Sequence, residues 1–461
     1  MRPSAQANPP AANTRKGLSR EEMKGLCDRI LGFATADFTR VNVESGVRGF
    51  TRTAMNRVTT AANTNDVAVR ITSVFGKRIA SIQTNSLDNA SLERAVKDAE
   101  ALARLSPENP EYLPEPEPQA YSEVNGYYSS TGDLTTEDRA RSASLVLERS
   151  KSANTIAAGF IDVFAGSDAV ANSRGLFAYH ASTGVASTLT VRTPDGSSSG
   201  WAGDEGADWA TIESERIATD ALTKCQNWRG KTALDAGLYE VILEPSAVGM
   251  LVSRMAGSFD ARAADEGRSY FSKRGGGTLL GEKVFDDRVT IASDPAFKNG
   301  EAAPFTGVGE PMRAETWVEN GVLKTLAYSR FWASRKNTAA KPSMANFVMS
   351  GGTASLEEMI ASVKRGVLIT RFWYIRPINP RLMSQTGLTR DGTFLIENGK
   401  VARPVTNFRF NQSIADLLKN VEMLGVPTRV AAEEDGSAGM PVIVPALKVR
   451  DFNLASVSDA I

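Results

Sequence analysis

The chain has 461 residues, of which 53 are Lys or Arg and 53 are Asp or Glu, so its formal net charge is zero. This balance argues against a nucleic-acid-binding protein, because neutralising phosphates requires a local excess of basic residues. With 42% apolar residues, the chain is long enough for two or three globular domains with sizeable cores.

Histidine and cysteine, which often carry catalysis and metal binding, are scarce in this chain. There is one histidine, His180, and there are two cysteines, Cys27 and Cys225. Neither a Ser-His-Asp triad nor a metal site of the H-E-x-x-H type can be built without His180. Two cysteines are too few for a Cys-rich zinc cluster or a disulfide framework, which fits a reducing compartment.

The sequence gives no sign of membrane insertion or export. No segment approaches the roughly 18 consecutive apolar residues of a membrane-spanning helix. Residues 1–16 contain Arg2, prolines and small polar residues, but no apolar stretch of the kind found in signal peptides. We therefore expect a disordered tail over residues 1–17 and a cytoplasmic protein without membrane contact.

Residues 18–230 are expected to form an N-terminal α+β domain. A first helix begins after Ser19, which forms a capping box with Glu22, and Cys27 falls on its apolar face. Apolar residues at helical spacing predict another helix over residues 89–105. Between these helices, β-branched and aromatic residues predict a meander of four antiparallel strands, at residues 38–43, 50–60, 67–75 and 79–84.

A proline-rich crossing segment at residues 106–119 follows. Its prolines alternate with acidic residues, a composition that favours an extended and semi-rigid chain. The sequence then predicts a helix over residues 137–152 and a turn at residues 173–175. Four antiparallel strands are expected at residues 155–164, 169–173, 176–182 and 185–193. A loop or irregular strand at residues 196–208 and a helix at residues 211–228 follow.

Residues 231–461 are expected to form a β-rich C-terminal domain, so that the whole chain is a two-domain α+β protein with largely antiparallel sheets. An apolar strand at residues 238–243 leads into a helix. Asn-Gly pairs at Asn320 and Asn398 predict type I′ hairpins, because both residues tolerate positive φ angles. Further predictions are a helix capped by Ser355 and Glu358 and stopped by Gly366, a strand at residues 367–375, and a helix over residues 413–424.

Four features could carry chemistry, and for each the structural interpretation is favoured. His180 lies in a predicted strand, where a lone histidine is more often a packed residue than a general base. Cys225 lies on the apolar side of a helix, where burial leaves a thiol inert. The glycine run at residues 275–277 is no phosphate loop, because Glu282 stands where lysine is needed. Basic and aromatic residues alternate between residues 364 and 381, but aromatic residues in a strand usually belong to the core.

Several short segments follow one another in an order that matches a known family. They are the strand-to-helix segment at residues 241–250, Ser293-Asp294-Pro295, Gly309-Glu310-Pro311 with residues 317–323, and Asn379-Pro380 with residues 386–387 and 395–400. The turn at Asn172 to Gly175 and the Gly-Ser-Trp loop after it also fall in this order. From about residue 17 to its end, the chain resembles the TldD/TldE (PmbA) family of zinc metallopeptidases. This resemblance implies a role in proteolysis.

The resemblance also locates a metal motif that this chain has lost. In the catalytic TldD branch, the helix after the apolar strand carries H-E-x-x-x-H, and a cysteine near the C-terminus completes the zinc site. The resemblance places Pro245 and Met250 at the two histidines and Ser246 at the glutamate, and residues 430–440 contain no cysteine. It therefore implies no catalytic residue and no metal site here, as in the TldE branch.

The leading hypothesis is a non-catalytic, TldE-like subunit that forms a heterodimer or larger complex with a zinc-bearing, TldD-like partner and processes peptides. Two alternatives stay open. A metal-independent enzyme acting on a small peptidyl metabolite would use carboxylates such as Asp260, Asp265 and Glu266. The second alternative is a regulatory binding protein, in line with an old link between this family and DNA gyrase. Zero net charge argues against direct contact with nucleic acid.

Overall fold

The structure is a computed structural model that describes residues 17–433 and 435–458. The tail predicted over residues 1–17 lies outside the described residues, except for Gly17. The chain forms a two-domain α+β fold with mostly antiparallel sheets, as expected. None of the described helices is long and apolar enough to cross a membrane. The predicted boundary near residue 230 stays a prediction.

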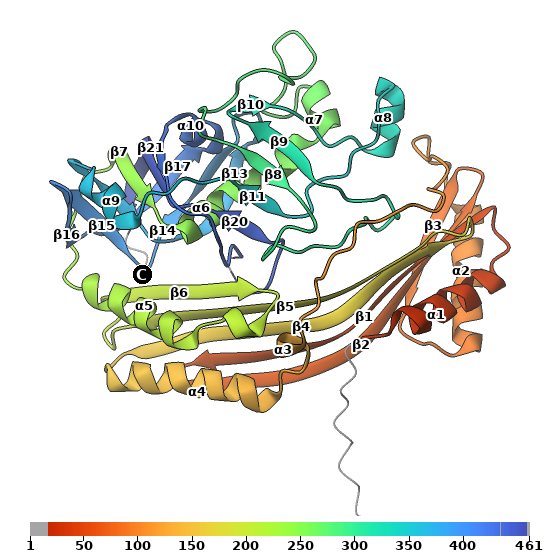
Figure 1. Ribbon diagram of the computed structural model, residues 1–461, viewed down its shortest axis with the longest axis horizontal. Coiled ribbons are helices and arrows are strands. Elements are labelled where there is room, and N and C mark those ends of the chain that lie inside the picture. Colours follow the sequence, from red (N-terminus) through yellow and green to blue (C-terminus); the bar gives the residue numbers. More distant parts are fainter. Residues whose placement is uncertain (1–16, 434, 459–461) are drawn as a thin grey trace, which may run out of the picture.

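The N-terminal part is built on a curved, six-stranded antiparallel sheet with the order β3-β2-β1-β4-β5-β6 (Figure 1). Its strands are β1 (Phe38–Ala54), β2 (Arg57–Phe75), β3 (Arg78–Thr84), β4 (Ile156–Asn172), β5 (Phe177–Arg192) and β6 (Ser199–Gly206). The strands are longer and fewer than predicted, because glycines such as Gly46, Gly166 and Gly184 lie inside them. The strand predicted at residues 50–60 is wrong, since the turn between β1 and β2 falls at Met55 and Asn56. Gly46 and Gly166 are paired in register, and a Cβ on Gly166 would overlap the backbone of Ser45. Close approach of two strands therefore requires glycine there.

Four long helices cover one face of this sheet: α1 (Arg20–Phe33), α2 (Asn89–Leu105), α4 (Thr136–Ser152) and α5 (Ser214–Asn227). Capping boxes start α1 at Ser19 and α4 at Thr135, so the first predicted helix start is confirmed. Alternate residues of β4 pack under these helices, for example Ala157 under α5 and Ala169 under α1 and α2. The short elements α3 (Ser129–Gly132) and η1 (Trp209–Thr211) lie between them in the sequence.

The C-terminal part contains two sheets, one with the order β10-β9-β8-β11-β20-β19 and one of nine strands around β21 and β7. The strands are β7 (Gly237–Leu243), β8 (Ile291–Ser293), β9 (Glu315–Glu319), β10 (Val322–Leu323), β11 (Phe347–Met349), β12 (Arg365–Ile369), β13 (Phe372–Asn379), β14 (Ser384–Thr389), β15 (Thr393–Glu397), β16 (Lys400–Pro404), β17 (Asn407–Ser413), β18 (Val421–Leu424), β19 (Thr428–Arg429), β20 (Val442–Val444) and β21 (Leu447–Ser458). The helical elements are α6 (Pro245–Val252), η2 (Ser253–Phe259), α7 (Ala261–Asp265), α8 (Arg330–Lys336), α9 (Leu356–Ala361), η3 (Pro380–Leu382) and α10 (Ile414–Lys419).

Some C-terminal predictions are confirmed and others are wrong. Both Asn-Gly hairpins are present, with positive φ angles at Asn320 and Asn398. The helix predicted over residues 413–424 ends at Lys419, because Val421 and Leu424 pair with β21 instead. The single strand predicted at residues 367–375 is divided into β12 and β13. In the N-terminal part, the segment predicted at residues 196–208 as a loop or irregular strand contains β6. The capping box at Ser355 is present, but its helix ends at Ala361 and not at Gly366.

The C-terminal domain lies against the sheet face opposite the four helices (Figure 1). On that face, Val170 of β4 packs against Phe305 of the C-terminal domain. The proline-rich segment at residues 106–119 contains no helix or strand and is fastened to the sheet, since Asn172 Nδ2 donates to the Pro116 carbonyl at 2.8 Å. This stacking brings edges of separate sheets to a common cavity.

Candidate functional site

Two of the three positions that the resemblance assigns to a metal motif, Pro245 and Ser246, border a large cavity between the two domains. The cavity has a volume of about 820 Å³ and is lined by residues 201–208 of β6 and the turn after it, by the side of α5, by the start of α6, and by residues 427–430. This volume falls in the range of about 300–1,000 Å³ that is typical of ligand sites. The cavity is therefore the leading candidate for a functional site.

Two sheet edges meet at this cavity. β6 is the last strand of the N-terminal sheet, and β19 is the last strand of one C-terminal sheet. Arg429 on β19 bridges them, because its Nη2 lies 3.2 Å from Glu205 Oε1 on β6 and its Nη1 donates to the Asn299 carbonyl at 3.2 Å. An edge strand carries backbone groups that have no partner within its own sheet. The cavity wall thus offers backbone donors and acceptors to an extended ligand.

Glu205 is the most perturbed acid of the cavity. Its side chain is 1% exposed, and this burial raises its pKa to about 7, although the guanidinium of Arg429 acts in the opposite direction. The carboxyl therefore changes its charge near neutral pH. Sequence reasoning missed this pair, because Glu205 and Arg429 are separated by 224 residues and no local motif connects them.

Most other charged groups of the cavity are paired with each other. Lys224 Nζ on α5 lies 2.7 Å from Glu244 Oε2, directly before α6. Tyr128 Oη donates to Glu301 Oε1 at 2.8 Å, and burial together with Glu301 raises the pKa of Tyr128 to about 12. These contacts fix the walls of the cavity.

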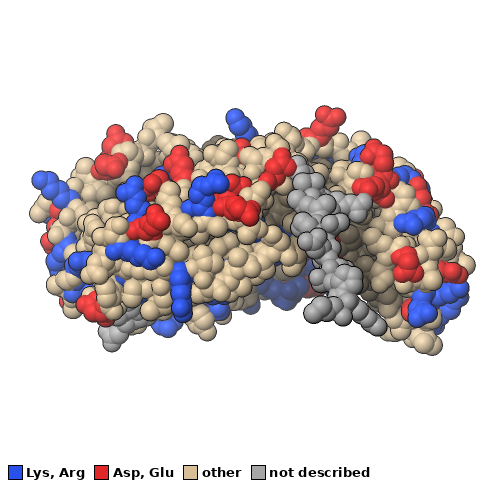
Figure 2. Space-filling model, turned by 90° about the horizontal axis from the view of Figure 1, so that it is seen from below, with Lys and Arg blue, Asp and Glu red and all other residues tan. Residues whose placement is uncertain are grey.

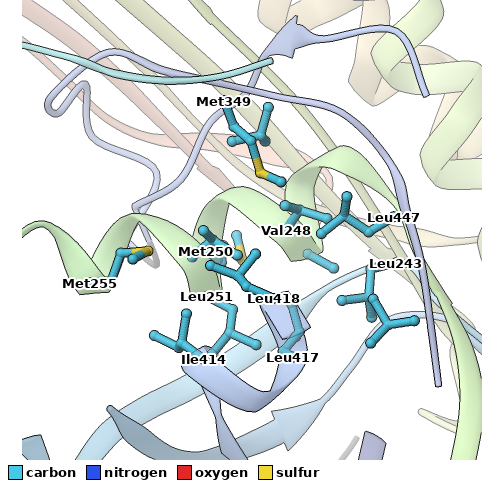
Figure 3. Close-up of a cluster of buried hydrophobic side chains, with 14 of the residues drawn as sticks. Leu243, Val248, Met250, Leu251, Met255, Met349, Ile414, Leu417, Leu418 and Leu447 are labelled. Atoms are coloured by element: carbon cyan, nitrogen blue, oxygen red, sulfur yellow. The ribbon is translucent and has the colours of Figure 1, made fainter. Parts of the chain in front are cut away.

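The structure separates the three positions assigned to the metal motif. Pro245 and Ser246 line the cavity, and Pro245 occupies the first turn of α6, where proline is tolerated. Ser246 follows it inside the helix, whose cap position is Glu244. Met250 is 1% exposed and lies in the apolar core, near Leu251, Leu418 and Ile414 in Figure 3.

The neighbourhood of α6 does not fit a zinc ion. Among the described residues, no three His, Cys, Asp or Glu side chains are grouped so that they could hold a metal. The segment where the family carries its cysteine provides Val430, which packs so closely on α6 that a Cβ on Gly249 would overlap it. An apolar contact therefore joins this segment to α6.

The other sequence candidates lie elsewhere. His180 is buried and borders a separate cavity, and burial lowers its pKa. Cys225 is buried, and burial raises its pKa, as expected for an inert thiol. The glycines at residues 275–277 have positive φ angles and lie in a loop. None of these groups lines the cavity beside α6.

The carboxylates proposed for a metal-independent enzyme are engaged in local contacts. Asp260 accepts from the backbone N–H of Ala263 and caps α7. Asp265 accepts from Trp332 Nε1 at 2.7 Å, and Glu266 pairs with Arg262 at 2.9 Å. They do not line the cavity beside α6.

The basic and aromatic residues between positions 364 and 381 are partly exposed. Phe372 is buried, as predicted, but Tyr374 is 53% exposed, so the expectation that these aromatic residues belong to the core is wrong for Tyr374. On the face shown in Figure 2, basic and acidic side chains are interspersed.

The buried position of Met250 leads to a prediction about restoring the motif. We expect Met250→His to lower the free energy of unfolding by about 2–4 kcal/mol, because an imidazole there lacks polar partners. Zinc content, measured by mass spectrometry on the purified protein, should stay at background. Ser246→His, at the cavity wall, serves as the control and should change stability little. Stoichiometric zinc in the Met250→His protein would contradict this interpretation.

The raised pKa of Glu205 predicts a specific pH dependence of stability. Between the ordinary carboxyl pKa of 4.5 and the folded value of about 7, the folded chain holds a proton that the unfolded chain releases. Stability due to this group is therefore complete below about pH 4.5 and is lost as the pH rises through 7, by up to about 3 kcal/mol. Urea unfolding from pH 5 to 8 should show this loss in the native chain and not in Glu205→Gln. Parallel curves would refute the assignment.

Comparison with known proteins gives this geometry a context. Residues 236–456 match the PmbA/TldA metallopeptidase C-terminal domain. A metalloprotease of Methanothermobacter thermautotrophicus is 25% identical over 243 residues, which cover 47% of this chain and 50% of the relative. A metalloprotease TldD homolog of Haemophilus influenzae is 22% identical over 294 residues, which cover 57% of this chain and 58% of the relative. The chain thus spans about half the length of these curated relatives.

The fold is also found in a solved structure. TldE from Thermococcus kodakarensis superposes with a TM-score of 0.81 at 19% identity, over 94% of this chain and 100% of that one. A sequence identity of 19% is too low for function to be inferred from this structure, but the shared fold extends through both domains. The C-terminal domain is thus similar to that of the PmbA/TldA metallopeptidases, and the chain as a whole shares the fold of a TldE structure.

Proposed function

We propose that this chain is a non-catalytic, TldE-like subunit of a peptidase complex, and that a TldD-like partner supplies the zinc and the hydrolytic chemistry. The observation that carries this proposal is which residues stand at the three positions matched to the metal motif and where they lie. Pro245 and Ser246 border the cavity without a histidine, cysteine or carboxylate side chain of the kind that binds zinc, and Met250 is part of the core. The family framework is thus present where the residues for its chemistry are replaced.

The cavity supports a role in holding peptide substrates. An extended peptide can add to a sheet edge through main-chain hydrogen bonds, which gives affinity with little dependence on sequence. Both β6 and β19 present an edge to this cavity, and Arg429 with Glu205 fixes their separation. In the proposed complex, an unfolded peptide lies along these edges while the partner cuts it.

A reconstitution experiment tests the division of labour. The chain is purified alone and together with an H-E-x-x-x-H family member from the same genome. We expect background zinc and no peptidase activity from the chain alone, one zinc per complex, and activity that requires both subunits. A complex whose partner lacks its second histidine is the matched control and should be inactive. Robust cleavage or stoichiometric zinc in the lone chain would overturn the proposal.

Hydrogen exchange tests the docking of peptide on β6. We expect backbone amides of Gly203 and Glu205 to exchange more slowly when the complex with an inactivated partner is saturated with an unfolded peptide. The strand β3, at the opposite edge of the same sheet, provides the internal control, because it does not line the cavity. Unchanged exchange in β6, or equal protection of β3, would argue against strand addition at this site.

A further inference from the structure

A second cavity, apart from α6, is lined by six residues of the segment from Gly309 to Trp317. It has a volume of about 490 Å³ and lies between the proline-rich segment, residues 310–317, Arg330 of α8 and residues 340–343. Both Glu310 and Trp317 line it. The proposed function makes no use of this segment, although the sequence analysis singled it out.

The loop that carries Glu310 is fixed at several points. Thr306 accepts from the backbone N–H of Glu310 through Oγ1 at 3.1 Å, and the Thr306 N–H donates to the Glu310 carbonyl at 2.9 Å. The N-terminal domain holds the same loop, because Tyr121 Oη donates to the Gly309 carbonyl at 2.8 Å and Asn42 Nδ2 donates to the Gly307 carbonyl at 2.7 Å. These contacts hold the backbone of the loop, and the oxygens of the Glu310 carboxyl take part in none of them.

Three polar groups of this cavity lack a protein partner. The Trp317 side chain is buried, with the residue 1% exposed, and its Nε1 has no hydrogen-bond acceptor. Within the described residues, no cation lies within 4.0 Å of the Glu310 carboxyl and no carboxylate lies within 4.0 Å of the Arg313 guanidinium. Burial raises the pKa of Glu310, and Arg330 opposes this only in part. A buried donor without a partner costs about 1–3 kcal/mol, so its retention needs a reason.

The other charged groups of the cavity are already engaged. Lys341 Nζ lies 2.7 Å from Glu315 Oε2. Arg330 donates to the Pro114 carbonyl and lies 4.0 Å from Glu115 Oε2. The groups of this cavity without a partner among the described residues are therefore one carboxyl, one guanidinium and one indole N–H, which together match a ligand that carries both charges.

We propose that this cavity binds a short peptide or amino acid with both termini free. The ligand's α-ammonium group pairs with the Glu310 carboxylate, and its α-carboxylate accepts from the Arg313 guanidinium and from Trp317 Nε1. Hydrogen bonds between ionised groups are stronger than neutral ones, so a zwitterion satisfies all three groups at once. This site is separate from the cavity beside α6 and does not depend on the proposed partner subunit.

Calorimetric titration of the purified full chain tests this proposal. The probes are L-alanyl-L-alanine, its N-acetyl derivative and its C-terminal amide. We expect the free dipeptide to bind, and blocking either end to weaken binding by about tenfold or more. Glu310→Gln should weaken the free dipeptide by a similar factor and leave the N-acetyl derivative unchanged. Trp317→Phe, which removes only the indole donor, should weaken the dipeptide and its N-acetyl derivative alike.

A control variant in the other cavity distinguishes the two sites. Glu301→Gln removes a carboxylate beside Tyr128 and should leave dipeptide binding unchanged. Absence of binding at millimolar dipeptide, equal binding of the blocked probes, or full affinity in Glu310→Gln would each overturn the proposal. Loss of binding in Glu301→Gln but not in Glu310→Gln would assign the dipeptide to the cavity beside α6 and would likewise overturn it.

Discussion

Close apolar packing of α6 is the constraint on which the site depends. Gly249 has no room for a Cβ against Val430, and Met250 on the next position is sealed in the core. In a metal-dependent fold, part of the folding free energy comes from the bound ion, because its ligands come together only in the folded chain. In this chain, buried side chains of α6 belong to the apolar core, and this packing holds the helix beside the cavity.

This packing changes what the cavity can do. Two pairs of charged groups connect its walls. Lys224 with Glu244 joins α5 to the start of α6, and Arg429 with Glu205 joins β19 to β6. Buried ion pairs contribute little net stability, but they fix the relative positions of the elements that carry them. A wall with fixed sheet edges and paired charges suits the docking of an extended chain more than bond-breaking chemistry.

The sequence predicted local elements well and long-range arrangement poorly. Capping boxes at Ser19 and Ser355 and the turns at Asn320 and Asn398 depend on neighbouring residues, and the structure contains them. The long strands were divided at glycines such as Gly166, because only the partner strand reveals why glycine is needed there. For the site, the replaced motif residues were readable, whereas the raised pKa of Glu205 depends on burial between two domains, which no local pattern encodes.

The two cavities differ in how their charges are balanced, and this difference fits two kinds of recognition. Beside α6, most charges are neutralised within the protein, so a ligand gains mainly from the backbone groups of β6 and β19, which every peptide can match. In the cavity of Glu310, none of the described residues places a cation within 4.0 Å of the Glu310 carboxyl or an acceptor at the buried indole N–H of Trp317. Only a ligand that brings its own charges satisfies that arrangement. Backbone recognition along a strand and terminus recognition in a small cavity are physically distinct, and the two proposals assign one of them to each cavity.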